Sequence, residues 1–317
     1  SQENPTSGTD RAGRVEQMRR ISSVDLMLMT TVVLWAFNFS VTKYVLSHGF
    51  QPLAYSAIRY GAAAVIFTVF TARREGWKPT IGRRDWMLLG IAAGVGIWLN
   101  QIGYVYSIKL TTASTVALIL GVTPIFAALG AWALGTERLP GRFWFAAAVS
   151  FLGVALVAGG SGSSFTGSVA GDLLAVMTAA TWAAYSLIVA PLMRRHSPYR
   201  ISSIVLAVGW IPLAITASHQ LASQSWDLSW QVYACLVYAT IGPLVITNVL
   251  WYTAVSRVGA SRATLFANIQ PFFAALIAVL LLSEPLSWSQ VAGGAAIAIA
   301  LVLSRLQQQT PQEPLAD

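Results

Sequence analysis

One stretch of this sequence occurs twice and decides the fold. Residues 113–139 read ASTVALILGVTPIFAALGAWALGTERL, and residues 260–286 read ASRATLFANIQPFFAALIAVLLLSEPL. Both copies contain Ala-Ser, then Pro-x-Phe-Ala-Ala-Leu, then Glu-x-Leu, at a constant offset of 147 residues. Alanine and leucine match by chance in apolar segments, but a proline and a glutamate at one fixed offset indicate an internal duplication.

The same offset continues toward the N-terminus of each copy. It relates Asp25 to Asp172, Thr31 to Thr178, and Trp35-Ala36 to Trp182-Ala183. We therefore expect a first repeat over residues 21–159 and a second repeat over residues 160–306. The polar segments 1–20 and 307–317 are expected to be disordered cytoplasmic tails. Residues 1–20 contain no apolar run, so no cleavable signal peptide is predicted.

The composition of the chain indicates a membrane protein. Of its 317 residues, 56% are apolar and only 10% are charged, whereas a soluble domain carries about 25% charged residues. Ten spans of about 20 residues each account for the length and leave no room for a soluble domain. In chain order, these predicted spans 1 to 10 lie at about 24–46, 53–72, 86–106, 112–134, 143–159, 170–192, 200–218, 231–254, 262–282 and 287–304.

The basic residues indicate how the chain crosses the membrane. Apart from Lys43, Arg59 and Lys109, every lysine and arginine lies near a terminus or in alternate connections between spans. Positively charged connections stay in the cytoplasm, so we expect both termini in the cytoplasm, with ten spans between them. This asymmetry explains the net charge of +8 without a nucleic acid partner.

Each repeat contains five predicted spans, and an odd number makes the second copy cross the membrane in the opposite sense. The predicted fold class is an all-α polytopic membrane protein, with ten transmembrane helices arranged as two inverted five-helix repeats around a central cavity. Such repeats suit alternating access, because exchanging the conformations of the two halves converts an inward-open state into an outward-open one.

Polar and aromatic residues recur at helical spacing in spans 1, 3, 4, 6, 8 and 9, which we expect to form an inner ring. Spans 2, 5, 7 and 10 lack such a stripe. Two other roles stay open, because amides commonly bond between membrane helices and aromatic residues form belts at the membrane interface. The predicted substrate-binding residues are Trp35, Asn38, Asn100, Tyr104, Trp182, Tyr185, Asn248, Tyr252 and Asn268.

Pro124 and Pro271 lie near the middles of spans 4 and 9. A proline removes a backbone donor and clashes with the preceding turn, which frees a carbonyl four residues earlier. Matching positions in two inverted halves favour hinges at Gly121, Pro124 and Pro271. The alternative is a static kink in each span.

The charged residues limit the class of substrate. No Asp or Glu lies at mid-depth in a span, which argues against exchange of protons for cationic drugs. Polyanions would need more inward basic groups than the chain offers, and Lys43 is expected to snorkel to the surface. Arg59 lies about 10 Å into span 2. It binds a substrate carboxylate, or it holds span 2 to span 1 or 3 through Asn38 and backbone carbonyls.

A nearly uncharged aromatic cavity suits neutral or zwitterionic solutes with an apolar body. The sequence indicates no cofactor, no metal site and no enzyme, since no nucleophile–base pair or paired carboxylates appear at membrane depth. The single cysteine, Cys235, excludes a disulfide framework. Small residues at 292, 296 and 300 form a stripe on which a second copy can pack, so a monomer or a weak homodimer is expected.

The repeated motifs resemble the EamA-type branch of the drug/metabolite transporter superfamily. Within it, the chain is most similar to bacterial inner-membrane exporters of aromatic and hydrophobic amino acids, which implies the same location. The resemblance extends over residues 24–305 and implies a ten-helix basket that exports from the cytoplasm. Small four-helix relatives use a buried glutamate for proton exchange. Here the deep positions of span 1 are Trp35 and Asn38, which argues against obligatory proton antiport.

The expected function is therefore export of aromatic and other hydrophobic amino acids by alternating access, with the lipid bilayer and a small-molecule substrate as partners. Two alternatives stay open. One is a broader exporter of neutral metabolites such as nucleobases, or of drugs. The other is a pore without alternating states.

Overall fold

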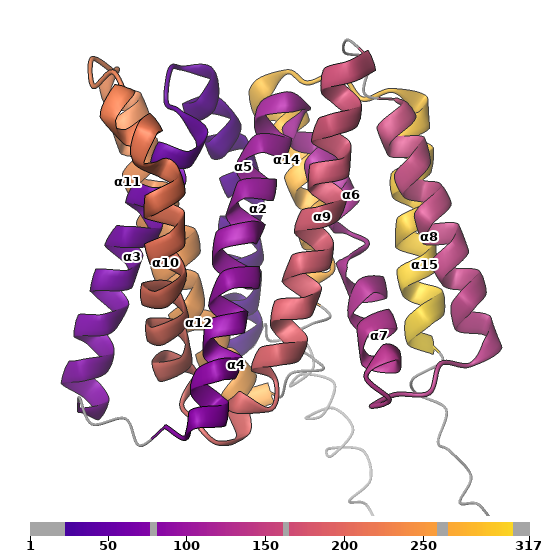
Figure 1. Ribbon diagram of the computed structural model, residues 1–317. Coiled ribbons are helices and arrows are strands. Elements are labelled where there is room, and N and C mark those ends of the chain that lie inside the picture. Colours follow the sequence, from indigo (N-terminus) through magenta and orange to yellow (C-terminus); the bar gives the residue numbers. More distant parts are fainter. Residues whose placement is uncertain (1–22, 77–80, 161–164, 259–265, 307–317) are drawn as a thin grey trace, which may run out of the picture.

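The computed structural model describes residues 23–76, 81–160, 165–258 and 266–306, and these ranges are almost entirely helical (Figure 1). The first half contains α2 (Ser23–Ser47), α3 (Pro52–Glu75), α4 (Arg83–Ala93), η1 (Gly94–Leu99), α5 (Asn100–Leu110), α6 (Ala113–Leu120), α7 (Thr123–Ala133) and α8 (Gly141–Gly159). The second half contains α9 (Phe165–Val189), η2 (Leu192–Arg194), α10 (Pro198–Ser223), α11 (Trp230–Thr240), η3 (Ile241–Ile246), α12 (Thr247–Val258), α14 (Gln270–Leu282) and α15 (Trp288–Leu306). The tails predicted at 1–20 and 307–317 lie outside the described residues.

The described helices are those of a polytopic membrane protein. Among them, eight segments are long and apolar enough to cross a membrane: Ser23–Ser47, Pro52–Glu75, Arg83–Leu110, Ala113–Ala133, Gly141–Gly159, Val169–Arg194, Pro198–Ser223 and Trp230–Val258. Two shorter apolar helices, Gln270–Leu282 and Trp288–Leu303, follow. The predicted ninth span begins at residue 262, before the described part resumes at 266. Ten crossings therefore stay a prediction.

The backbone repeats its irregularities at the offset of the sequence repeat. Two π-helical segments, η1 and η3, interrupt spans 3 and 8, and their bounds differ by 147 residues. Spans 4 and 9 each break just before a proline, at residues 121–122 and 268–269. The same backbone bond occurs in both breaks: the amide of Val122 donates to the Ile119 carbonyl (3.1 Å), and that of Ile269 to the Phe266 carbonyl (3.0 Å). Because π segments are rare, this recurrence fits two copies of one inverted unit.

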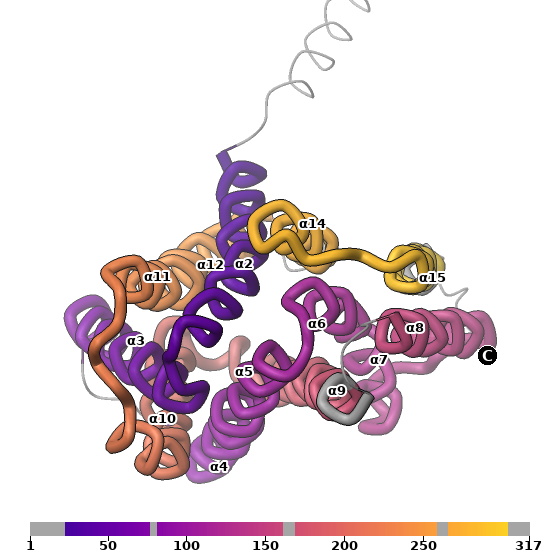
Figure 2. The backbone as a smooth tube through the Cα atoms, turned by 90° about the horizontal axis from the view of Figure 1, so that it is seen from above, coloured from indigo at the N-terminus to yellow at the C-terminus, as the bar shows by residue number. Residues whose placement is uncertain are grey.

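The helices form an elongated bundle with one pair of helices at each end (Figure 2). α8 packs against α15 at one end and α3 against α10 at the other, while α2, α5, α6, α9, α12 and α14 pack against one another between the pairs. α8 approaches α15 closely because Gly153 faces Gly293: a Cβ on either would lie within 2.7 Å of the other's carbonyl oxygen. Each end pair joins equivalent helices of the two repeats, as a pseudo-twofold axis requires.

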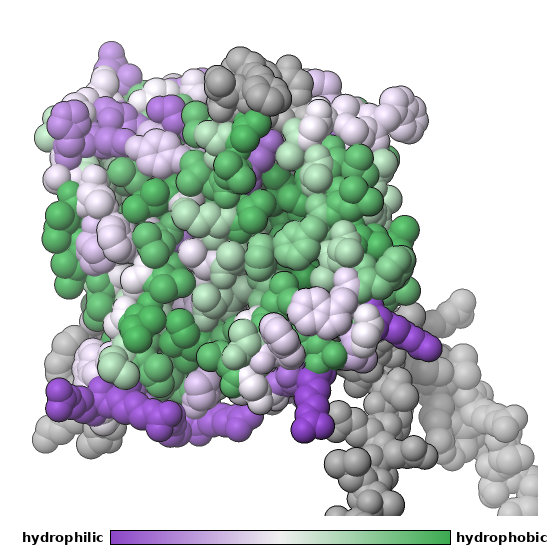
Figure 3. Space-filling model, turned by 45° about the vertical axis from the view of Figure 1, so that its right-hand side comes forward, coloured by the Kyte–Doolittle hydropathy of each residue, from purple (hydrophilic) through white to green (hydrophobic). Residues whose placement is uncertain are grey.

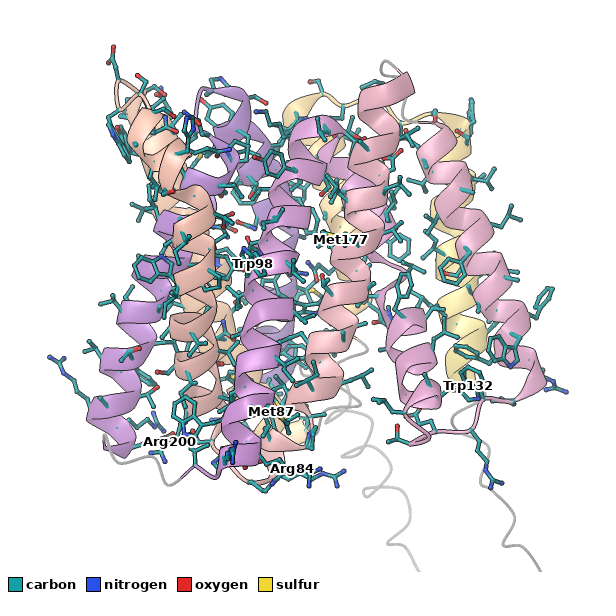
Figure 4. All side chains as sticks on the ribbon, viewed as in Figure 1. Arg84, Met87, Trp98, Trp132, Met177 and Arg200 are labelled. Carbon is teal, nitrogen blue, oxygen red and sulfur yellow. The ribbon has the colours of Figure 1, made fainter. Side chains whose placement is uncertain are left out.

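Apolar side chains cover the middle of the outer surface, as Figure 3 shows. Large side chains such as Val65, Ile215 and Leu280 are 64–70% exposed, which suits contact with lipid rather than water. Charged residues gather at the lower end of the molecule, where Arg84 and Arg200 lie (Figure 4). We refer to this end as the basic end.

Candidate functional site

A buried chain of hydrogen bonds joins α2, α3 and α5. The amide nitrogen of Asn38 donates to the hydroxyl of Tyr104 (3.1 Å), which donates to Oγ1 of Thr42 (3.4 Å). The same Oγ1 lies 3.2 Å from the hydroxyl of Tyr55. Asn38 and Thr42 are one turn apart on α2, so both reach the same neighbours. We refer to Asn38, Thr42, Tyr55 and Tyr104 as the Tyr104 cluster.

Arg59 lies beside the Tyr104 cluster and is only 2% exposed. Its guanidinium covers the ring of Tyr55, 4.7 Å from the ring centroid, and lies 5.9 Å from the centroid of Tyr60. Its Nε donates to the Ala239 carbonyl of α11 (3.2 Å). We expected a structural Arg59 to bond to span 1 or 3, through Asn38 and carbonyls. The bond is instead to span 8, because α11 packs against both α2 and α3.

Asn100 connects α5 to α9. Its amide nitrogen donates to the Thr178 carbonyl (3.0 Å) and to Oγ1 of Thr181 (3.1 Å). Its Oδ1 accepts a bond from Gln101 (3.4 Å), whose own Oε1 accepts one from Ser56 of α3 (3.4 Å). The amide nitrogen thus bonds between helices, which is the alternative role that the sequence left open for amides, and the oxygen is occupied by a neighbour on the same helix.

Trp35 is half-buried where α2 meets the second repeat. Its Nε1 donates to the Pro243 carbonyl of η3 (3.2 Å), and its ring centroid lies 5.3 Å from that of Trp251 on α12. A π segment leaves carbonyls poorly matched to the helical bonding pattern, and an indole N–H from a neighbouring helix satisfies one of them here.

Trp182, the counterpart of Trp35, is 43% exposed. Its ring centroid lies 5.1 Å from that of Tyr185, one turn further along α9. Tyr185 in turn covers Gly96 of η1, where an added Cβ would lie 2.3 Å from the tyrosine ring. Each of the helices α2 and α9 therefore packs an aromatic side chain against the π segment of the other repeat.

The predicted pair Asn248 and Tyr252 lies nearer the basic end. Asn248 donates to a carbonyl one turn earlier in its own helix (2.5 Å). The hydroxyl of Tyr252 lies 2.8 Å from Oγ of Ser202, at the start of α10. Tyr104 and Tyr252 therefore lie in opposite halves of the bundle, as inversion of the repeat demands. Asn268 is half-buried in the break before α14.

Two hollows in the described part of the molecule both lie against α3. The larger, about 580 Å³, is lined by Val65, Ile66, Val69, Phe70, Arg73 and Arg74. The smaller, about 260 Å³, lies beside Gly61 and Trp210, where α3 meets α10. No predicted substrate-binding residue lines either hollow, so neither is the central cavity that the sequence predicts.

Glu284 ties α14 to α6 at the end of the bundle opposite the basic end. Its carboxylate accepts bonds from the amides of Ala113 and Ser114 (2.9 Å each) and from the Ser114 hydroxyl (2.7 Å). A carboxylate here satisfies unpaired N–H groups and offsets the positive end of the helix dipole. The repeated Ala-Ser and Glu-x-Leu motifs thus meet, one from each half. Glu137, the counterpart of Glu284, is exposed.

Lys43 lies at the same end as Glu284. Its Nζ donates to the carbonyls of Ile108 (2.8 Å) and Thr111 (2.6 Å) at the end of α5. Lys43 is half-buried, so its ammonium group binds the end of a neighbouring helix instead of extending freely to the surface. The last carbonyls of a helix have no partner within it, and they lie within reach of the ammonium group.

The two helix breaks lie close together inside the bundle. A Cβ added to Gly121 would lie 3.6 Å from Cβ of Pro271. Within the first break, the hydroxyl of Thr123 donates to the Leu120 carbonyl (2.6 Å), which is the carbonyl that Pro124 leaves without its helical donor. The proline thus ends the regular helix, and a neighbouring side chain satisfies the exposed group.

Three buried residues of this region are not among the predicted site residues: Tyr55 and Tyr60, which contact Arg59, and Gln101, which accepts a bond from Ser56 of α3. One signal was available, because Tyr55 precedes Arg59 by one helical turn and therefore shares its face of span 2. Span 2 lacks a longer polar and aromatic stripe, so the sequence predicts that it lies outside the inner ring.

Long apolar helices, two equivalent halves and a buried polar and aromatic centre are the features of a polytopic membrane transporter. The sequence profile of the EamA-like transporter family matches residues 22–159 and 169–306. The chain belongs to this family. Both ends of the matched segments differ by 147 residues, so each half of the chain is one family unit.

Relatives of similar length are also transporters. An uncharacterized transporter of Archaeoglobus fulgidus is 23% identical over 90% of this chain and 99% of its own length. The uncharacterized transporter YdeK of Bacillus subtilis is 26% identical over 86% of this chain and 94% of its own length. A crystal structure with 18% identity and a TM-score of 0.62 covers 93% of this chain and 100% of that chain, and has the same fold. The names of these relatives specify no substrate.

Proposed function

We propose that this transporter exports aromatic and other hydrophobic amino acids from the cytoplasm across a bacterial inner membrane. The observation that carries the proposal is the chemistry of the buried centre. Two tyrosine rings of α3 contact the buried guanidinium of Arg59, and neutral polar groups of α2 and α5 bond to one another beside it. No Asp or Glu of the sequence lies at mid-depth in a predicted span. Ring faces favour flat apolar side chains, and sparse charge favours a solute without net charge.

The proposed topology has ten crossings, with α14 and α15 completing the set. The basic end then faces the cytoplasm, together with both termini and the polar tails 1–20 and 307–317. The repeats 21–159 and 160–306 cross in opposite senses. The substrate path runs from Tyr252 in the cytoplasmic half, past Trp35, to Tyr104 in the outer half. The other predicted contacts are Asn38, Asn100, Trp182, Tyr185, Asn248 and Asn268.

Alternating access is the proposed mechanism. The bonds from Ala113 and Ser114 to Glu284 hold the outer end closed, and opening that end requires them to break. The interrupted helices at Gly121, Pro124 and Pro271 give spans 4 and 9 a place to bend. Since the breaks recur in both halves, the same motion can open either side.

Counterflow in proteoliposomes tests the proposed substrate. Labelled phenylalanine is added outside vesicles that contain unlabelled phenylalanine, with and without a pH gradient. We expect transient accumulation of label that is independent of the gradient. Accumulation only with the gradient would reveal proton coupling. No accumulation would remove phenylalanine as a substrate.

The same assay separates the two alternatives. A pore cannot accumulate label against an internal unlabelled pool, so accumulation excludes it. Competition by adenine as strong as that by unlabelled phenylalanine would favour the broader exporter of neutral metabolites. Weak competition by adenine would favour amino acids.

A further inference from the structure

Two buried polar groups beside Tyr104 have no hydrogen-bond partner among the described residues. They are Nη1 of Arg59, which is a donor, and Oδ1 of Asn38, which is an acceptor. Arg59 is 2% exposed and Asn38 is 8% exposed. Buried polar groups are nearly always paired. An unpaired donor and an unpaired acceptor in one cluster therefore point to a ligand that carries the complement of each.

The two unpaired groups lie at the same depth. Asn38 precedes Thr42 by one turn on α2, and Arg59 follows Tyr55 by one turn on α3. Thr42 and Tyr55 are bonded to each other. Because α2 and α3 run in opposite directions, Asn38 and Arg59 are both displaced from this bonded pair by one turn in the same direction along the bundle. Tyr104 links the two sides. It bonds to Asn38 and to Thr42, whose hydroxyl also contacts Tyr55 beneath the guanidinium of Arg59.

No acidic side chain of the described residues is seen to pair with the guanidinium. Every Asp and Glu of the sequence lies outside the middle parts of the predicted spans. Ion pairs to Asp85 and Glu75 involve Arg195, His196 and Arg200 near the basic end. A cation buried in a medium of low dielectric constant is unfavourable unless an anion pairs with it. A ligand carboxylate would supply that anion.

Arg59 is held in place without using its whole hydrogen-bonding capacity. Nε is fixed by the Ala239 carbonyl and the guanidinium plane rests on Tyr55, while Nη1 stays free. Such fixed geometry is what a preorganised binding group needs. A purely structural arginine would direct the same nitrogen at another carbonyl.

Within the described ranges, this arrangement has no equivalent in the second repeat. At the offset of 147 residues, the counterparts of Asn38 and Arg59 are Tyr185 and Leu206. The π segments and helix breaks recur in both halves, whereas the unpaired donor and acceptor belong to one half only. A ligand with a single pair of different charged groups matches this asymmetry.

We infer that Arg59 and Asn38 bind the head group of an α-amino acid zwitterion. The guanidinium binds the α-carboxylate, and Oδ1 of Asn38 accepts a bond from the α-ammonium group. This inference rests on the proposed function and deepens it, since it names the group that separates amino acids from other apolar solutes. The two charged groups of the ligand sit on one carbon, so they fit a donor and an acceptor that share one cluster.

Binding of three ligands to the purified full-length protein tests the inference. They are phenylalanine, phenylalaninamide (which keeps the ammonium group but has no carboxylate) and 3-phenylpropionate (which has only the carboxylate). Affinities are measured by calorimetry in detergent for the natural protein and for Arg59→Gln and Asn38→Leu. Thr68→Val is the matched control, because the Thr68 hydroxyl lies on the same helix as Arg59 but contacts Ser203 of α10 (3.3 Å).

We expect each of the two variants to lose affinity for a different pair of ligands. Arg59→Gln lowers the affinity for phenylalanine and for 3-phenylpropionate by roughly tenfold to a hundredfold, as for loss of a bond to a charged group. The affinity for phenylalaninamide stays unchanged. Asn38→Leu weakens phenylalanine and phenylalaninamide and leaves 3-phenylpropionate unchanged. Thr68→Val changes none of the three. Misfolding cannot produce opposite selectivities in two variants. If Arg59→Gln does not yield stable protein, Arg59→Lys is used, and the same two ligands weaken by a smaller factor.

The outcomes separate this inference from the proposed function. If phenylalanine shows counterflow but its binding does not depend on the head group, the proposed function stands and the inferred subsite is wrong. If phenylalanine does not bind, the assay is repeated with leucine, leucinamide and 4-methylpentanoate. Dependence of leucine binding on Arg59 and Asn38 would keep the subsite and remove the aromatic substrate. No head-group dependence in either series, or equal weakening of all ligands, overturns the inference.

Discussion

Amide side chains serve two purposes inside this bundle. Asn100 bonds to α9 through its amide nitrogen and accepts a bond from its neighbour Gln101 through its oxygen, so its role is structural in the conformation seen here. Asn38 uses only its nitrogen, on Tyr104, and leaves its oxygen without a partner among the described residues. Both lie on polar stripes at helical spacing. Spacing predicts that an amide faces the interior. Only the surrounding side chains determine which of its donors and acceptors stay available to a ligand.

At the scale of single residues, we expect Trp35→Ala to lower the rate of phenylalanine counterflow by about tenfold. The change removes both the bond to the Pro243 carbonyl and the ring contact with Trp251, and a tenfold change corresponds to roughly 1.4 kcal/mol in the transport barrier. The rate is measured per unit of monodisperse protein reconstituted in vesicles.

Trp230→Ala is the matched control for Trp35→Ala, because Trp230 is 74% exposed at the start of α11 and lies where interfacial tryptophans are expected. We expect transport by this control to be unchanged. An unchanged rate for Trp35→Ala would remove Trp35 from the proposed path.

At the scale of elements, a proline does not by itself interrupt a helix of this protein. α10 continues through Pro212 as one helix from Pro198 to Ser223, whereas spans 4 and 9 stop and restart just before Pro124 and Pro271. The difference fits hinges, since only the latter two prolines follow residues that have left the helical hydrogen-bonding pattern.

Replacing either Pro124 or Pro271 with alanine should slow turnover more than it weakens binding. Alanine restores a backbone donor and lets the helix become continuous, which hinders bending. We expect kcat for counterflow to fall about fivefold, equivalent to roughly 1 kcal/mol, with KM nearly constant. Pro212→Ala should change neither value. A rise in KM at constant kcat would contradict the hinge.

The contact of Glu284 with α6 gives a second prediction at this scale. Glu284→Gln removes the charge from a carboxylate that accepts three hydrogen bonds, and bonds to a charged group contribute about 1.5–3 kcal/mol each. The outer end should therefore open more often. Ser107 is fully buried near this end of α5, so its replacement by cysteine provides a probe.

The probe is Ser107→Cys in a Cys235→Ser background. Its modification by an impermeant maleimide from outside should become roughly tenfold faster with Glu284→Gln. Glu137→Gln, the equivalent change at an exposed position, should leave the rate unchanged. Equal rates in all three proteins would show that Glu284 does not control the opening of this end.

At the scale of the whole molecule, the proposed topology predicts which residues are reached from each side. In a Cys235→Ser background, cysteines at the exposed positions 48 and 227 should react with impermeant maleimide in intact cells, and cysteines at 84 and 138 only after the membrane is opened. Labelling of position 84 or 138 in intact cells would contradict the proposed topology.

The large-scale features could be predicted because they rest on residue types. Apolar runs predicted the helical segments, and paired prolines predicted where spans 4 and 9 are interrupted. The π segments could not be predicted, because no residue type marks them and their positions depend on packing. The partners of Arg59 and Lys43 were missed for a related reason. Both side chains bind backbone carbonyls of distant helices, and a carbonyl has no signature in a sequence.

The matched positions of the two π segments have a consequence for the ancestry of this chain. From the first π segment to the glutamate after span 4, the second half has gained or lost no residue relative to the first. Duplication of one unit accounts for this match. At the position of Arg59 the other half has Leu206. The two halves thus share the interruptions of their helices and differ at the residues that we infer to bind the two charged groups of a ligand.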